Sequence, residues 1–321
     1  MRMIVTIGLL IASVSFISAN AFARASVKAR QEPNGKGRFV YLFTSFRGNG
    51  EDGLHLAYSE DGFMWTDLGG GFLAPKVGIS KLMRDPAMIL TPDGTFHMVW
   101  TAGWAEAGIG YASSRDLVNW TEQQYIRVME NDPTARNAWA PEVVFDEKAK
   151  QFVIYWSSTV PGKYPLIGDN AEEWNHRAYY VTTRDFKKFS ATKLLFDPGF
   201  NCIDETLVKR DRGGYAMVFK DERESGKKLR VAFADKPTGP FRDVSEPFTP
   251  QYHSEGPTVA RVGEDWVVYY DLYNDGKYAA MKTRDFKTWE DASTQLAMPA
   301  GTRHGSVLRV PRAVVMALLK R

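Results

Sequence analysis

The chain has 321 residues and a formal net charge of +3. Its 41 basic and 38 acidic residues form no basic cluster, which argues against a nucleic-acid partner. The single cysteine, Cys202, excludes an internal disulfide framework.

The first residues have the pattern of a secretory signal peptide. Arg2 precedes an apolar run, and Ala-Phe-Ala at residues 21–23 provides a cleavage site. No later segment is apolar over the roughly 20 residues that a membrane helix needs. We therefore expect a signal peptide over residues 1–23, a linker over residues 24–36, and a secreted or periplasmic protein that is not attached to a membrane after cleavage.

The body of the chain contains a motif that recurs five times. Each copy combines a strand end, a polar turn that holds an Asp, an aromatic residue and a second short strand. The copies lie roughly 50 to 70 residues apart, which is within the range of propeller blades. They occupy residues 58–68, 113–123, 182–192, 232–244 and 282–292.

A pair of strand-like runs precedes each copy, such as "GRFVYLFTSF" and "EDWVVYYDLY". These runs are apolar or alternate over the length of a strand, and no segment of the body has a convincing helical period. The pattern predicts an all-β fold, a five-bladed β-propeller over residues 37–312. The spare strand "RHGSVLRVP" should complete the first blade and close the ring. The C-terminal tail, residues 313–321, receives no structural prediction.

Polar residues recur where the innermost strand of each blade begins. Because these strands converge on the propeller axis, their first residues should meet at one mouth of the central tunnel. Carboxylates that lie this close repel one another, so at least one pKa should rise. Each site alone is ordinary turn chemistry, and the argument depends on all five together. They are Asp85 in "MRDPAMIL", Glu142 in "AWAPEVVF", Asp204 in "CIDETLVK", Glu255 in "SEGPTVAR" and His304 in "RHGSVLRV".

Through "RDPAMI", "WAPE", "IDE", "EGPT" and "RHGS", nearly the whole chain after residue 36 resembles glycoside hydrolase family 43. The resemblance implies that Asp85 is the general base, Asp204 the pKa modulator and Glu255 the general acid of an inverting hydrolase. Inversion requires one carboxylate to activate water and a protonated one on the other side of the scissile bond, about 6.5–9.5 Å away.

Further residues are candidates for binding the sugar. An ion-pairing role suits the arginines equally well, and a core role suits the tryptophan of "WAPE" and the histidine of "RHGS". The long insertion from Val160 to Arg177, which includes Trp174, should line the rim of the pocket. The candidates are Arg84, Trp104, Trp139, Glu142, His176, Arg303 and His304. Trp65, Trp120 and Trp289 belong to the repeated turn and are predicted to fill the core.

The sequence therefore predicts an exported exo-glycosidase that removes terminal arabinofuranosyl, xylosyl or galactosyl units from plant-type polysaccharides or oligosaccharides. The alternatives are a non-catalytic glycan-binding propeller, a fructosidase or a glycoside phosphorylase. We expect a monomer that needs no cofactor, and no metal ligands are assigned. The family likeness leaves open a calcium ion near the axis, beside His304.

Overall fold

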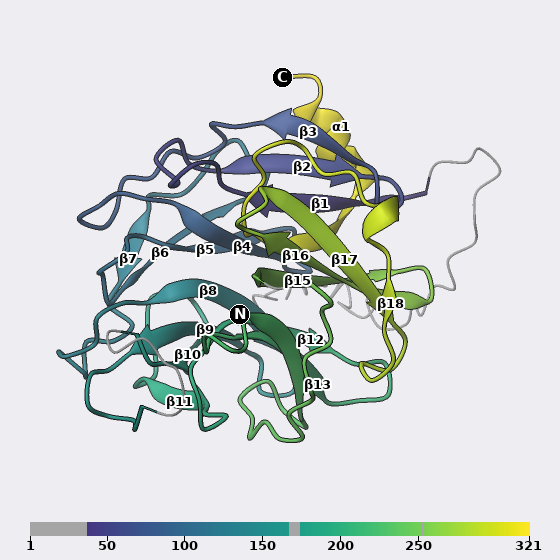
Figure 1. Ribbon diagram of the computed structural model, residues 1–321. Helices are drawn as coiled ribbons and strands as arrows, with labels where there is room; N and C mark the ends of the chain where they lie inside the picture. The colour runs from purple at the N-terminus through teal and green to yellow at the C-terminus, as the bar shows by residue number, and fades with distance from the viewer. Residues whose placement is uncertain (1–36, 167–173, 252) are drawn as a thin grey trace, which may run out of the picture. The chain divides into compact units, whose positions relative to one another are not determined.

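Five antiparallel sheets form a β-propeller in the computed structural model, which describes residues 37–166, 174–251 and 253–321 (Figure 1). The predicted fold class is thereby confirmed. The signal peptide and the linker, predicted for residues 1–36, lie outside the described residues. Within the described ranges, no helix combines the length and the apolar character needed to cross a membrane.

Each blade consists of strands that are consecutive in the chain, except the first. The first blade contains β19 (Val307–Pro311), β1 (Phe39–Ser45), β2 (His55–Ser59) and β3 (Trp65–Gly69). The second contains β4 (Arg84–Leu90), β5 (Phe96–Thr101), β6 (Ile109–Ser114) and β7 (Gln124–Ile126). The third contains β8 (Trp139–Asp146), β9 (Gln151–Thr159), β10 (His176–Thr183) and β11 (Lys193–Phe196). The fourth contains β12 (Cys202–Lys209), β13 (Tyr215–Asp221) and β14 (Lys228–Ala234), and the fifth contains β15 (Ser254–Val262), β16 (Asp265–Leu272), β17 (Lys277–Thr283) and β18 (Glu290–Asp291).

The C-terminal strand closes the ring. Strand β19 pairs antiparallel with β1, in a register that runs from Phe39 opposite Pro311 to Phe43 opposite Val307. Because the two strands come from opposite ends of the described chain, this pairing joins the last part of the propeller to its first blade. The predicted ring closure is confirmed.

One feature differs from the predicted pattern, and another was not predicted. The fourth blade has three strands rather than four, and only a single bridge between Phe233 and Arg242 marks the place of an outer strand. Pro237 and Pro240 in this segment lack the N–H groups that a strand ladder needs. The C-terminal residues, for which no structure was predicted, form α1 (Arg312–Leu318), which buries apolar side chains against the first blade.

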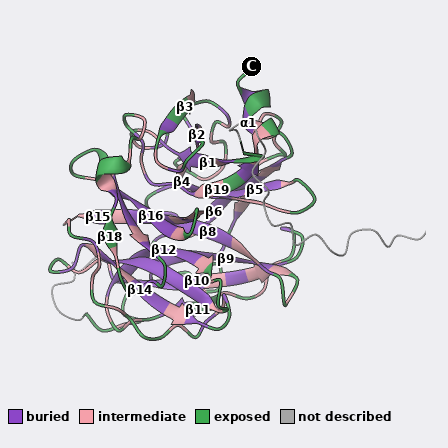
Figure 2. Cartoon of the chain, turned by 90° about the vertical axis from the view of Figure 1, so that its right-hand side faces the viewer, coloured by how far each residue is buried: buried purple, intermediate pink, exposed green. Residues whose placement is uncertain are grey.

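Apolar side chains fill the space between neighbouring blades, and exposed residues concentrate in the connecting loops (Figure 2). Four of the repeated turns are held by an Asp side chain that accepts backbone hydrogen bonds. Asp116, for example, binds the N–H groups of Val118 and Asn119. The tryptophans of these turns are in the core as predicted, with Trp65 buried, and Trp120 and Trp289 partly buried against apolar clusters.

Candidate active site

The innermost strands begin with the same backbone irregularity in four blades. Strands β4, β8, β12 and β15 each have a register shift within their first residues. At each shift one residue has a left-handed backbone conformation, which is rare away from glycine and often marks functional sites. These residues are Asp85 (φ 50°), Ala140 (φ 46°), Asp204 (φ 59°) and Gly256 (φ 57°).

The acidic residues do not occupy equivalent positions in their strands. Asp85 and Asp204 occupy the left-handed position itself. Glu255 precedes the left-handed residue of its strand by one position, and Glu142 follows Ala140 by two. Since side chains alternate in direction along a strand, these offsets decide where each carboxyl group lies.

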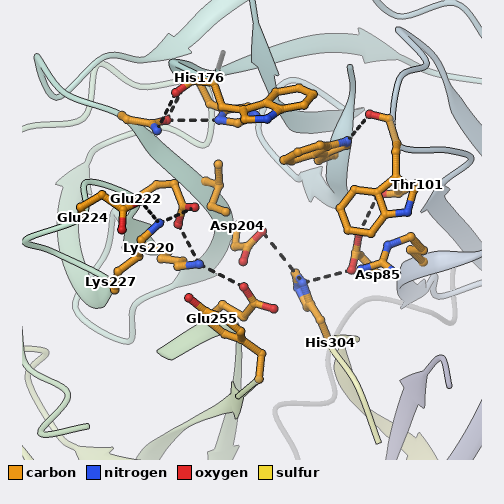
Figure 3. A pocket seen from close by; sticks show the side chains of 17 residues that line it. Asp85, Thr101, His176, Asp204, Lys220, Glu222, Glu224, Lys227, Glu255 and His304 are labelled. Carbon is orange, nitrogen blue, oxygen red and sulfur yellow. Dashed lines mark hydrogen bonds and ion pairs between the residues drawn. The ribbon is translucent and has the colours of Figure 1, made fainter. Parts of the chain in front are cut away.

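A cavity of about 350 Å³ lies where the innermost strands begin. It brings together the three predicted catalytic carboxylates, Asp85, Asp204 and Glu255, which come from three blades (Figure 3). Of the predicted binding residues, Arg84, Trp104, Trp139, His176 and His304 line it, whereas Glu142 and Arg303 are not among the lining residues. The other lining residues are Thr101, Trp174, Asn201, Ile203, Lys220, Glu222, Glu224, Lys227 and Tyr273.

His304 occupies the centre of this arrangement. Its Nδ1 atom lies 3.4 Å from Asp85 Oδ1 and 4.0 Å from Asp204 Oδ1. Burial disfavours the charged imidazole, but the negative charges of Asp204 and Asp85 outweigh it and raise the pKa of His304 to about 9. At neutral pH the ring is therefore a cation between two carboxylates.

Asp85 is held in its ionised form. Its Oδ2 atom accepts a hydrogen bond of 2.8 Å from Thr101 Oγ1. Burial opposes ionisation, but the hydrogen bond and the charge of His304, with the charge of Arg84, outweigh burial and lower the pKa of Asp85 to about 2. A carboxylate that is ionised, oriented and exposed to a cavity can act as a general base.

Asp204 has the opposite electrostatic environment. Burial raises its pKa to about 6, since the charge of His304 compensates only in part and Glu255 adds a repulsive negative charge. Its position is fixed by backbone contacts. The N–H of Gly256 donates to Asp204 Oδ2 at 3.0 Å, and the N–H of Asp204 donates to Ser157 Oγ at 3.2 Å. The pKa of at least one carboxyl group at this mouth of the tunnel is therefore raised, as the sequence predicted.

Glu255 is bound by two cations. Lys220 Nζ donates to Oε2 at 3.0 Å, and Arg303 Nη2 donates to Oε1 at 3.3 Å. Arg303 also binds Asp271 Oδ2 through Nε at 2.6 Å. Arg303 therefore contacts the predicted acid directly, which agrees with the ion-pairing alternative for this residue.

Aromatic side chains form one side of the cavity. The rings of Trp104 and Trp139 meet edge to face at 5.5 Å, and Trp174 stacks on His176 at 5.6 Å with nearly parallel planes. Arg84 covers the Trp104 ring at 4.1 Å. Trp104 nonetheless keeps 48% of its surface exposed, so part of it can contact a ligand. Burial lowers the pKa of His176 to about 4, so its ring is neutral at neutral pH.

Glu142 lies beneath the cavity. Its Oε2 atom accepts hydrogen bonds from Tyr155 OH at 2.7 Å and from Thr206 Oγ1 at 2.9 Å. Burial raises its pKa to about 7 despite these two donors. Through these hydrogen bonds Glu142 on β8 links its strand to β9 and β12. Glu142 is not among the residues that line the cavity.

Sequence reasoning missed the charged side of the cavity. Lys220 is the second-last residue of β13, and Glu222, Glu224 and Lys227 follow in the run "KDERESGKK". Such a run after an apolar strand is typical of a solvated hairpin turn, and nothing in it distinguishes a cavity wall. The one available signal is that Lys220 occupies a strand position rather than the turn itself.

The calcium ion left open at the axis finds no set of ligands. Within residues 37–166, 174–251 and 253–321, no group of three or more His, Cys, Asp or Glu side chains could hold a metal ion. In addition, the protonated ring of His304 at this position would repel a cation. The residues present do not fit a calcium site.

Over residues 38–315 the sequence matches the glycoside hydrolase 43-related family, which is described as "Probable glycosyl hydrolase domain". The chain belongs to this family. The match confirms the resemblance to glycoside hydrolase family 43, and the description of the matched domain agrees with the predicted enzyme class.

Individual relatives of this chain are distant, and it spans only a small part of the curated relative that it matches. An alpha-L-arabinofuranosidase of Bifidobacterium longum subsp. longum is 28% identical over 145 residues, which cover 40% of this chain and only 13% of that protein. The fold is similar to that of an alpha-L-arabinofuranosidase from Lactobacillus brevis (17% identity, TM-score 0.53, 66% of this chain and 72% of that chain). It is also similar to the endo-arabinase from Bacteroides thetaiotaomicron VPI-5482 (15% identity, TM-score 0.52, 69% and 84%). At these identities the structural likeness establishes the fold alone.

Proposed function

We propose that the protein is an exported, inverting exo-glycosidase that releases terminal arabinofuranosyl, xylosyl or galactosyl units from plant-type polysaccharides or oligosaccharides. One observation carries the proposal: three carboxylates from three blades face one cavity of about 350 Å³. The position of this cavity at the axis, with aromatic side chains on one side, favours a single terminal sugar unit. A relative that is named as an alpha-L-arabinofuranosidase supports arabinofuranosyl among these sugars.

In this mechanism Asp85 activates water. Its low pKa keeps it ionised, and Thr101 and His304 orient its two oxygens. Glu255 acts in its protonated form: it donates a proton to the glycosidic oxygen as the bond to the anomeric carbon breaks, and it takes up a proton from solvent before the next cycle. Figure 3 shows Asp85 and Glu255 on opposite sides of His304, an arrangement that suits attack from one face and departure from the other.

Asp204 takes the predicted role of modulator. Asp204 is connected to both of the other carboxyl groups. It contacts His304, which also contacts Asp85, and it accepts a hydrogen bond from the N–H of Gly256, which directly follows Glu255. Its negative charge acts on the proposed acid, and its backbone contact links the two inner strands. A sugar in the cavity would stack on the exposed part of Trp104.

The substitution Glu255→Gln tests the role of the acid. Cleavage of unactivated glycosides should fall by roughly 10²- to 10⁴-fold, the usual contribution of a general acid. Dinitrophenyl glycosides should be spared in part, because their leaving group needs no proton. Glu264→Gln, an exposed carboxylate paired with Arg284, is the matched control and should hydrolyse both substrates as fast as wild type.

Hydrolysis of a panel of nitrophenyl glycosides, with NMR of the first-formed anomer, tests the rest. A product of inverted configuration supports the mechanism, and a retained configuration contradicts it. A wild-type protein that binds these sugars but cleaves none would instead be a glycan-binding propeller. Export is tested by N-terminal sequencing of the protein from the culture medium or periplasm, where the chain should begin after Ala23.

A further inference from the structure

A chain of ion pairs passes through Glu255 and crosses from the fourth blade to the fifth. Positive and negative side chains alternate along it, so every charge has an opposite neighbour. In order, the pairs are Lys227–Glu222 (2.9 Å), Glu222–Lys220 (2.7 Å), Lys220–Glu255 (3.0 Å), Glu255–Arg303 (3.3 Å) and Arg303–Asp271 (2.6 Å).

Among the cations of these ion pairs Lys220 is the most buried, with 2% of its side chain exposed. Its ammonium group contacts Glu255 and Glu222, and it lies 4.5 Å from the centre of the Tyr273 ring. Burial disfavours the charge, but the two glutamates outweigh burial and raise the pKa of Lys220. Lys220 therefore contacts the proposed acid directly, and its ammonium group lies between two carboxylates.

The two cations bind different oxygens of Glu255. Lys220 binds Oε2 from the end of β13, and Arg303 binds Oε1 from the segment before β19. Two contacts on two oxygens fix the plane of a carboxyl group, whereas one contact leaves it free to rotate. Each carboxyl oxygen has two acceptor positions, so one on each remains for a proton or a substrate oxygen.

We propose that Lys220 is a positioning residue for Glu255: together with Arg303 it fixes the carboxyl plane so that the free edge faces the glycosidic oxygen, and Glu222 holds Lys220 in place. The inference depends on the proposed role of Glu255 as the general acid. Proton transfer requires a donor within hydrogen-bond reach and in line with the acceptor, so a rotating carboxyl group would lose most of this contribution.

The test compares two substrates of the same sugar, a dinitrophenyl glycoside and an unactivated disaccharide. Lys220→Met should lower kcat on the disaccharide by roughly 10- to 100-fold, part of the full contribution of a general acid, with little change in KM. The dinitrophenyl glycoside should lose less than about threefold, since its departure needs no proton. Glu222→Gln, which keeps the shape and removes the charge that holds Lys220, should give the same pattern with a smaller loss.

Two controls separate positioning from damage to the fold. Lys209→Met removes an exposed lysine of the same blade, paired with Glu147, and should change neither rate. In a Glu255→Gln background, Lys220→Met should cause no further loss that depends on the leaving group, because the donor is already absent. Equal losses on both substrates in Lys220→Met and Glu222→Gln would overturn the inference and leave the role of Glu255 intact. A wild-type enzyme that cleaves neither substrate would instead refute the proposed function, and this inference with it.

Discussion

Glu205 provides a quantitative test of the electrostatics at the propeller axis. It neighbours Asp204 on β12 but is 1% exposed, and Ser157 Oγ donates a hydrogen bond of 2.8 Å to its Oε2 atom. The Oε1 atom has no hydrogen-bond partner in the described part of the chain. Burial, which the Ser157 hydrogen bond offsets only in part, raises the pKa of Glu205 to about 8. The side chain is therefore a neutral acid at neutral pH.

This pKa determines the sign and the size of the pH effect. The folded protein favours the protonated form, so the stability that Glu205 contributes is fully present below its ordinary pKa of 4.5 and is lost as pH rises through about 8. At 1.36 kcal/mol per pKa unit, the loss is about 5 kcal/mol. Some water entry around the ionised group would reduce it, so we expect about 3 to 5 kcal/mol in practice.

The substitution Glu205→Gln keeps the shape and removes the titration. Urea unfolding, followed by tryptophan fluorescence at pH 4.5 and pH 9, measures the free energy of unfolding of both proteins. Between pH 4.5 and pH 9 the free energy of unfolding of the variant should rise by about 3 to 5 kcal/mol relative to that of wild type. Glu147→Gln, an exposed residue, should show no such gain. A difference between Glu205→Gln and wild type that is the same at both pH values would refute the reasoning, because it would mean that the buried carboxyl group does not titrate in this range.

Three other predictions follow from the same geometry. Gly305→Ala should lower the free energy of unfolding by several kcal/mol in urea titrations, because an added Cβ would lie 1.8 Å from the carbonyl oxygen of Thr44; unchanged stability would contradict the close approach at the ring closure. Trp104→Ala should raise KM for the best glycoside by roughly 10-fold, the worth of about 1.4 kcal/mol of lost stacking, and an unchanged KM would exclude Trp104 from the sugar site. His304→Gln should destabilise the protein most between about pH 4 and 6.5. The ion pair between His304 and Asp85 stops stabilising the fold as pH falls through the pKa of Asp85, about 2, and as pH rises through that of His304, about 9. The thermal unfolding temperatures of wild type and His304→Gln should therefore converge near pH 10.

The sequence alone was sufficient for the fold and for the position of three carboxylates. Strand periodicity and the Asp-containing turns are local signals, and their fivefold recurrence indicated the number of blades. A strand left over after the fifth repeat indicated ring closure. Because innermost strands must converge on the axis, Asp85, Asp204 and Glu255 were predicted to meet there, and the structure places them around one cavity. Their catalytic roles remain predictions.

Only the tertiary structure decided what surrounds these carboxylates. A bulge at the start of β8 places Glu142 two positions after the left-handed residue Ala140, and the side chain is buried below the cavity. Lys220 reaches Glu255 from a different blade, and the turn-like sequence after it gives no sign of this contact. The pKa values of Asp204 and His304 also depend on burial and on charges that come from several blades. Local sequence specifies the strands and turns, whereas charge pairing and burial arise between segments that are distant in the chain and become neighbours only when the ring closes.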